Sequence, residues 1–244
     1  MLGSQNLNRQ KGVVTAACNP LTDVAGIKVW LKIESLSGNS NGASLAAWND
    51  SSSNGLNFSQ AGAAKPTYST TAGPGGGPAV VTATQYMTSA ATTQAQPFTV
   101  IAVVATTNVV GFIEFYFGTA NSSNITLYTN TNGTYNIAAT TALSSSTGLA
   151  VANVWHTWAA IYNSTSSELW IDGGTAVAGP GNAGTNGFSS AGMEIGGVNG
   201  ASLAATSTEF TDLLVYSGAL TTAQINTVAG CVAGLRGLSW SPAL

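Results

Sequence analysis

Apolar and polar residues alternate along much of this chain. Residues 26–33 carry apolar side chains at every second position, which places these side chains on one face of an extended segment. They are Ile27, Val29, Leu31 and Ile33. Residues 98–104 are apolar on both faces, a pattern typical of a central strand covered on each side. Such segments recur roughly every 8 to 15 residues between glycine-rich turns. The pattern predicts an all-β fold: a two-sheet antiparallel β-sandwich with jelly-roll topology.

Two turns stand out between these segments. Residues 73–78 (Gly-Pro-Gly-Gly-Gly-Pro) form a loop, and no Lys-Ser or Lys-Thr pair follows as a phosphate-binding loop would require. Asn132 and Gly133 predict a β-hairpin. A tight turn there would place Tyr135 opposite Asn130, with Tyr128 and Tyr135 on the same face of the hairpin.

One short helix is predicted near the C-terminus. Thr221 and Gln224 form a capping box, in which each side chain hydrogen-bonds the other residue's backbone amide. The residues that follow place one apolar stripe on the helix, which we expect to pack on the sheets. The stripe consists of Ile225, Val228, Ala229 and Val232.

The order of motifs in the last third resembles laminin G-like domains of the concanavalin A-like lectin/glucanase superfamily. The motifs are Trp155-His156-Thr157-Trp158, Glu168-Leu169-Trp170-Ile171-Asp172-Gly173-Gly174, Met193-Glu194-Ile195-Gly196-Gly197, Phe210-Thr211-Asp212-Leu213-Leu214 and Leu220-Thr221-Thr222-Ala223-Gln224. An earlier Trp48-Asn49-Asp50 turn, followed by Lys65-Pro66-Thr67-Tyr68, resembles the first half of the same family.

The resemblance implies one sandwich domain over residues 23–237, with an N-terminal arm (1–22) and a C-terminal tail (238–244). It also implies core positions for Trp30, Trp48, Trp155, Trp158 and Trp170. Proteins with this fold bind sugars, cleave glycosides or make structural contacts, so the fold alone leaves the function open.

Charge is scarce in this chain. Charged residues make up 6% of the 244 residues, compared with about 25% in ordinary globular proteins, and the net charge is −3. This composition argues against binding to nucleic acid or to anionic membranes. It suits a protein that packs against copies of itself or that meets neutral, hydroxyl-rich ligands.

The two cysteines, Cys18 and Cys231, leave two alternatives open. In the resembled fold the terminal strands often lie side by side, which would allow a disulfide. The first residues show no apolar export signal, and a chain that folds in a reducing compartment keeps its thiols free.

Catalysis is not expected. The chain has one histidine, His156, for which the resemblance implies a packing role in a strand. Glycosidases need two carboxylates about 5 to 9.5 Å apart. Glu168 and Asp172 would share a strand face but lie roughly 13 Å apart. No cofactor is predicted. Asp50, with Asn49 and Asn54, could offer a partial set of calcium ligands, and an Asx-turn explains the same residues.

Two sets of residues are candidates for binding. Carbohydrate would stack on exposed aromatic rings beside polar groups, and the candidates are Tyr116, Tyr128, Tyr135, Glu114 and Asn130. Ordinary half-buried strand tyrosines are the alternative. The arms would dock on a partner through Arg9 and Lys11 at one end and an exposed Trp240 at the other.

These observations favour a non-enzymatic structural or surface protein of a virus particle, such as a phage capsid decoration, fibre or tail-associated protein. Its partners would be other virion proteins or copies of itself. The alternative is a carbohydrate-binding module or adhesin that recognises glycans at a cell surface.

Overall fold

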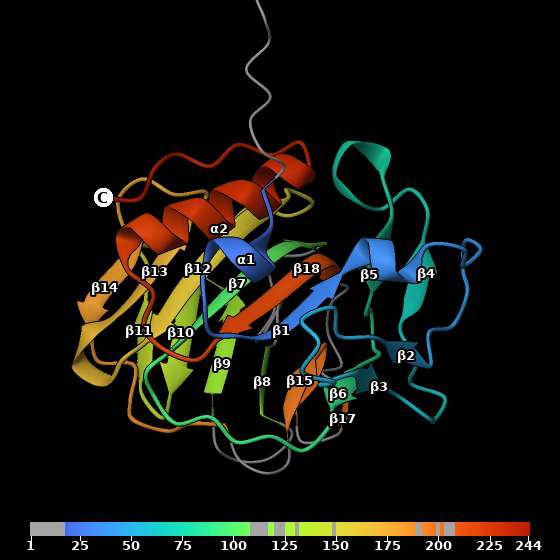
Figure 1. Ribbon diagram of the computed structural model, residues 1–244, viewed down its shortest axis with the longest axis horizontal. Helices are drawn as coiled ribbons and strands as arrows, with labels where there is room; N and C mark the ends of the chain where they lie inside the picture. Colours follow the sequence, from blue (N-terminus) through green and yellow to red (C-terminus); the bar gives the residue numbers. More distant parts are fainter. Residues whose placement is uncertain are drawn as a thin grey trace, which may run out of the picture.

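Two antiparallel β-sheets lie face to face, and a helix covers the outer face of one of them (Figure 1). The computed structural model describes residues 18–107, 117–119, 125–129, 132–147, 150–188, 192–198, 201–202 and 208–244. The predicted all-β sandwich with one C-terminal helix is therefore confirmed.

Eight described strands form the first sheet. Their order is β14 (Ala178–Gly181), β13 (Ser167–Ile171), β12 (His156–Tyr162), β7 (Phe98–Thr106), β18 (Thr208–Tyr216), β5 (Ala79–Val81) and β4 (Thr67–Ser69), while β1 (Ile27–Lys32) also pairs with β18. The second sheet has the order β11 (Ala142–Ser144), β10 (Tyr135–Ala139), β9 (Ile125–Thr129), β8 (Phe117–Thr119), β15 (Met193–Ile195), β6 (Met87–Ser89), β3 (Phe58–Ser59) and β2 (Ala47–Trp48).

Short elements complete the described chain. They are the two-stranded ribbon of β16 (Gly197–Val198) and β17 (Ala201–Ser202), the 3₁₀ turns η1 (Ile33–Leu36), η2 (Pro74–Gly76) and η3 (Ser164–Ser166), and the helices α1 (Pro20–Asp23) and α2 (Thr222–Leu235). Within the described ranges, no helix is long and apolar enough to cross a membrane.

The central strand β7 explains the two-layered core. Its side chains alternate between two apolar clusters: Val100 and Ala102 face the second sheet, while Ile101 and Val103 face the helix. Every residue of β7 is buried, as its apolar sequence predicts. Burial of each large side chain contributes about 1.5–3 kcal/mol, so this strand is a major source of stability.

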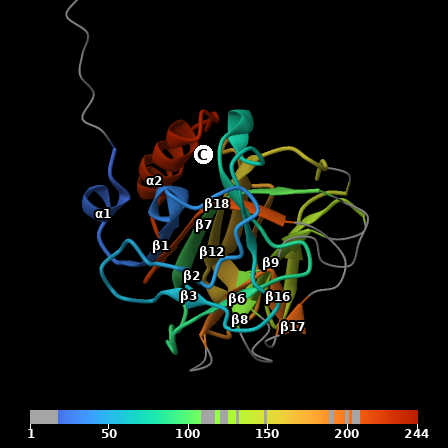
Figure 2. The ribbon, with the colours of Figure 1, turned by 90° about the vertical axis from the view of Figure 1, so that its right-hand side faces the viewer.

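Helix α2 forms the layer outside the first sheet, next to α1 (Figure 2). The predicted capping box is present: the Thr221 side chain accepts from the Gln224 amide, and the Gln224 side chain accepts from the Thr221 amide. The predicted stripe is buried against the sheet through Ile225, Val228, Ala229 and Val232.

The β9–β10 hairpin forms at Asn132–Gly133 as predicted, but its register differs by one residue. Tyr135 lies opposite Thr129 rather than Asn130, and Tyr128 lies opposite Asn136. Five residues, 130–134, separate the last paired positions, where the prediction assumed four. Because a shift of one residue moves a side chain to the other face, Tyr128 and Tyr135 lie on opposite faces.

The N-terminal boundary of the domain differs from the predicted one. Residues 18–22, assigned to an arm by the sequence, belong to the folded domain. Cys18 is joined to Cys231 of α2 by a disulfide, and α1 follows directly. The predicted docking residues Arg9 and Lys11 lie outside the described residues.

The C-terminal tail is also part of the domain, so the prediction of a free tail with an exposed Trp240 is wrong. The Ser241 amide donates to the Asp172 carbonyl at 2.9 Å, and Trp240 Nε1 donates to Asn226 Oδ1 at 2.9 Å. A side chain at Gly173 would lie 1.6 Å from the Ser241 carbonyl oxygen, so only glycine permits this approach. Trp240 is partly buried and packs on the α2 layer.

Candidate ligand-binding groove

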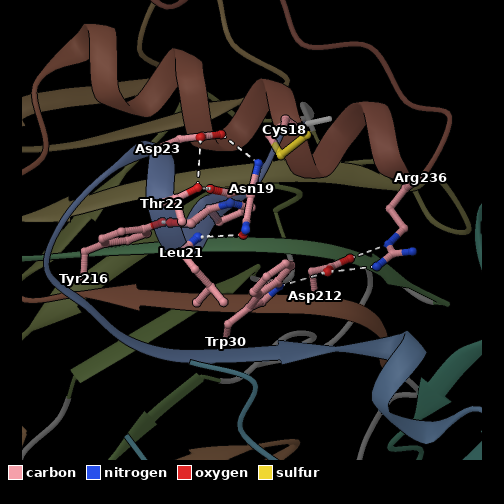
Figure 3. Close-up of a disulfide and its surroundings, with 11 residues drawn as sticks. Cys18, Asn19, Leu21, Thr22, Asp23, Trp30, Asp212, Tyr216 and Arg236 are labelled. Carbon is pink, nitrogen blue, oxygen red and sulfur yellow. Dashed lines mark hydrogen bonds and ion pairs between the residues drawn. A yellow bond between two sulfur atoms is a disulfide. The ribbon is translucent and has the colours of Figure 1, made fainter. Parts of the chain in front are cut away.

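An open groove of about 460 Å³ lies beside the disulfide, where α1, β1 and the end of α2 meet. Its lining residues are Cys18, Asn19, Leu21, Trp30, Lys32, Glu34 and Leu235. Figure 3 labels four of them, Cys18, Asn19, Leu21 and Trp30, and shows the side chains of Leu21 and Trp30 next to each other. The volume falls within the range of about 300–1,000 Å³ typical of small-ligand sites.

Local sequence determines the wall formed by α1. Pro20 occupies the first turn of the helix, where its missing amide hydrogen has no cost. The Asn19 side chain accepts from the Leu21 amide at 3.1 Å, and the Asn19 amide donates to Asp23 Oδ2 at 2.7 Å. These bonds hold Leu21 at the edge of the groove, with 37% of its surface exposed.

Strand β1 supplies the floor through its alternation. Val29 and Leu31 point into the core between the sheets, while Trp30 lies in the cluster under the helix layer. Lys32 belongs to the same face as Trp30, and its Nζ lies 4.8 Å from the centre of the indole ring. Trp30 is only 6% exposed, so its ring forms a floor beneath the lysine and not a free platform.

A β-bulge in β18 places an acid next to this floor. Phe210 pairs with Val104 and Asp212 pairs with Val103, so Thr211 is an extra residue. The bulge reverses the alternation of side chains and leaves Asp212 fully buried beside Trp30, whose Nε1 lies 3.4 Å from Asp212 Oδ1.

Arg236 joins this acid to the rim of the groove. Its Nε donates to Asp212 Oδ2 at 2.5 Å, and its Nη2 donates to Asp212 Oδ1 at 3.0 Å (Figure 3). The same guanidinium donates to both carboxylate oxygens of Glu34, with Nη2–Oε2 at 2.8 Å. Since Glu34 is 56% exposed and Asp212 is fully buried, the arginine connects the interior to the surface.

The two acids have opposite pKa shifts. Burial raises the pKa of Asp212, although the hydrogen bonds and positive charge of Arg236 act in the other direction. Hydrogen bonds from Arg236 lower the pKa of Glu34, and the charge of Lys32 adds to this effect. Glu34 is therefore a carboxylate at neutral pH, and its half-exposed side chain can accept further hydrogen bonds.

The groove thus combines an apolar surface with a few polar groups. Leu21 and Leu235 supply exposed apolar area at two edges, and Leu235 is 49% exposed. Lys32 and Asn19 can donate hydrogen bonds, and Glu34 can accept them. Such an arrangement can hold an uncharged ligand that has both apolar faces and hydroxyl groups.

The aromatic site predicted from the sequence does not assemble from the described residues. Tyr135 is 3% exposed and packs edge-on against Trp158, with ring centres 4.8 Å apart, so it cannot stack on a sugar. Tyr128 is half-buried on the other face. The remaining members of the predicted site, Tyr116, Glu114 and Asn130, lie outside the described residues.

His156 makes structural contacts at the edge of the core. Its Nδ1 lies 2.6 Å from Asp172 Oδ2, and the other carboxylate oxygen accepts from the Thr157 amide at 2.8 Å. A cavity of about 10 Å³ lies beside the imidazole, which is room for about one water molecule. A substrate does not fit there.

The acids do not form a glycosidase pair in the described part of the chain. The prediction that Glu168 and Asp172 share a strand face is wrong. Asp172 has a left-handed φ of 55° and lies beyond the end of β13. Glu34 and Asp212 both bind Arg236, but a fully buried Asp212 cannot contact a sugar.

Asp50 participates in a turn of the predicted Asx type. Its Oδ1 accepts from the Trp30 and Ser52 amides, and its Oδ2 accepts from the Ser52 hydroxyl and the Leu56 amide. The Asn54 side chain donates to backbone carbonyls and to Ser52 and so directs its nitrogen inward. These hydrogen bonds occupy the oxygens of Asp50 that a calcium ion would use.

Sequence reasoning missed the groove. Its lining residues come from positions 18–34 and 235, about 200 positions apart along the chain, and the bulge at Asp212 leaves no local signal in the sequence. The one useful signal was the Cys18–Cys231 pair, because a disulfide would have placed the N-terminal segment beside α2.

No protein-family model matches this chain, and no curated protein matches it. Solved structures do match in fold. The binding domain of Paraclostridial Mosquitocidal Protein 1 superimposes with a TM-score of 0.61 at 11% identity, covering 85% of this chain and 52% of the other. The receptor-binding domain of botulinum neurotoxin type G gives 0.59 at 12% identity, covering 84% and 51%. Trypanosoma rangeli sialidase in complex with sialic acid gives 0.54 at 16% identity, covering 84% and 33%.

At these identities the likeness shows the fold alone. The class that the fold and the comparisons define is an antiparallel β-sandwich, a fold that also occurs in the binding domain of the mosquitocidal protein and in the receptor-binding domain of the neurotoxin. The chain spans about half the length of the matched toxin chains and a third of the sialidase chain.

Proposed function

We propose that this chain is a non-enzymatic, lectin-like binding domain that holds neutral, hydroxyl-rich glycans in the groove beside Cys18. The observation that carries the proposal is the groove itself. It has the volume of a ligand site, apolar edges at Leu21 and Leu235, and donors and an acceptor at Lys32, Asn19 and Glu34. Pyranose rings present the same combination of apolar faces and hydroxyl edges.

Two further observations support a glycan ligand. The domains of similar fold in the mosquitocidal protein and the neurotoxin are named as binding and receptor-binding domains. The low share of charged residues, 6%, suits contact with an uncharged ligand. As a finer family assignment, we propose the laminin G-like branch of the superfamily.

The test is binding of the purified chain to an array of neutral oligosaccharides, repeated with matched variants. Lys32→Ala lies in the groove, and Lys28→Ala serves as its control, since Lys28 is exposed on the same strand but does not line the groove. Leu235→Ser lies in the groove, and Leu244→Ser is its control at an 86% exposed position.

We expect Lys32→Ala and Leu235→Ser to weaken retention about fivefold or more, which corresponds to loss of one good contact. The two control variants should bind like the wild type. Retention of no glycan, or equal losses in the groove variants and their controls, would reject the groove as the binding site.

A second candidate is a structural role on a virus particle, in contact with other virion proteins or with copies of itself. The observation in its favour is the charge-poor composition, which offers little repulsion between copies. Quantitative mass spectrometry of purified particles from the source would test it. Hundreds of copies per particle would indicate a capsid decoration protein, a few dozen a tail or fibre protein, and none would reject the virion role.

The place of action that we propose is an extracellular or particle surface. The Cys18–Cys231 disulfide supports this location, because such bonds persist in oxidising surroundings.

A further inference from the structure

The disulfide is itself part of the groove, since Cys18 is one of the lining residues. We propose that the Cys18–Cys231 bond is a redox latch: it holds residues 18–23 as one wall of the groove, and its reduction by a dithiol releases that wall. The inference rests on the proposed function, because the groove is the site where the glycan would bind. It adds a means of control by the redox state of the surroundings.

Few hydrogen bonds link this wall to the rest of the domain. The hydrogen bonds of Asn19, Leu21 and Thr22 are made within residues 19–23. Among the described residues, a single hydrogen bond links residues 18–23 to the rest of the fold, from the Tyr216 hydroxyl to the Pro20 carbonyl at 3.1 Å. Burial of Pro20 adds a small apolar contact. Helix α1 also packs against α2. The disulfide is thus the one covalent cross-link that holds the wall to α2.

The release has a defined boundary. Val24 belongs to the apolar cluster under α2, and the Gly26 carbonyl accepts from the Ser217 amide at 2.8 Å. From Ile27 onward the chain is paired with β18. The groove floor on β1 and the edge at Leu235 therefore keep their positions when the wall is released.

The two sulfur atoms differ in access. Cys18 is exposed, whereas Cys231 is 7% exposed. A thiolate of an external dithiol would attack Cys18 Sγ, and Cys231 would leave as the thiolate and take up a proton. The second thiol of the reductant then attacks the mixed disulfide and releases Cys18 as a thiol. Two electrons and two protons pass to the protein, and the dithiol is oxidised to a disulfide.

The experiment compares the full chain before and after dithiothreitol with the double variant Cys18→Ser/Cys231→Ser. Amide hydrogen exchange reports on the wall without any ligand. We expect exchange of residues 19–23 to accelerate on the order of tenfold or more on reduction, while β7, β18 and α2 keep their protection. In the double variant, residues 19–23 should exchange fast before any reductant is added, and dithiothreitol should not change their exchange rate.

Two exchange results would overturn the latch. Unchanged protection of residues 19–23 after complete reduction would mean that other contacts hold the wall. Loss of protection throughout β7 and β18 would mean that the disulfide maintains the whole fold. Any glycan retained by the oxidised chain should bind at least several-fold more weakly after reduction, and equal binding would reject control of the groove. If no glycan binds in either state, the proposed function fails while the exchange result still decides the release of the wall.

Discussion

Replacing Arg236 by methionine tests the charge network that links the groove to the interior. Asp212 is fully buried and receives two hydrogen bonds from Arg236, at 2.5 and 3.0 Å. In the variant its remaining side-chain donor is Trp30 Nε1 at 3.4 Å. Removal of one partner of a buried ion pair costs about 3–5 kcal/mol, because the other charge stays buried without compensation. For a chain of this size, that cost lowers the melting temperature by roughly 6–20 °C.

Two companion variants locate the effect. Glu34→Gln should cost less than about 1 kcal/mol, because this side of the network is 56% exposed and screened by water. Asp212→Asn combined with Arg236→Met should be more stable than Arg236→Met alone, since the uncompensated charge is gone. The assay is urea unfolding followed by tryptophan fluorescence.

The pH dependence gives an independent check. Burial raises the pKa of Asp212, and the hydrogen bonds and charge of Arg236 are the main effects that lower it. The Arg236→Met variant loses both of these effects, so the pKa of Asp212 should rise further. An acid whose pKa is higher in the folded state destabilises the fold once the pH rises above its unfolded value of about 3.9. The stability deficit of Arg236→Met should therefore be large at pH 7 and shrink as the pH falls toward 4. A deficit that is the same at both pH values, or a double variant no more stable than the single one, would refute this reasoning.

Three further predictions concern the fold. Thr221→Ala removes the helix cap and should cost about 1 kcal/mol in urea unfolding, with loss below about 0.3 kcal/mol contradicting the capping role. Gly173→Ala should displace the C-terminal tail, because the new methyl would collide with the Ser241 carbonyl; limited proteolysis should then cleave the tail faster, and an unchanged rate would argue against the docked tail. Tyr135→Ala should cost about 3–5 kcal/mol and Tyr128→Ala much less, since only the first ring is in the core; equal costs would contradict the observed register.

Much of the fold could be predicted from local patterns. Residues 98–104, predicted to be apolar on both faces, lie in β7, which is buried on both sides. The capping box at Thr221 precedes α2 as predicted. Alternation in residues 27–33 identified the strand that supplies the groove floor. The groove itself was not predicted, and the aromatic site that was predicted failed at Tyr135, whose ring is in the core.

The sequence by itself determined the elements and which of their faces are apolar. These properties depend on residues within a few positions of one another, where periodicity and capping act directly. Tertiary structure alone decided the register of the β9–β10 hairpin, the bulge that turns Asp212 toward Arg236, and the meeting of Cys18 with Cys231. A one-residue change in pairing alters which side chains meet without altering the local pattern. The candidate site consists of contacts between residues that are distant in the sequence, and the packing of the whole chain determines which of these contacts form.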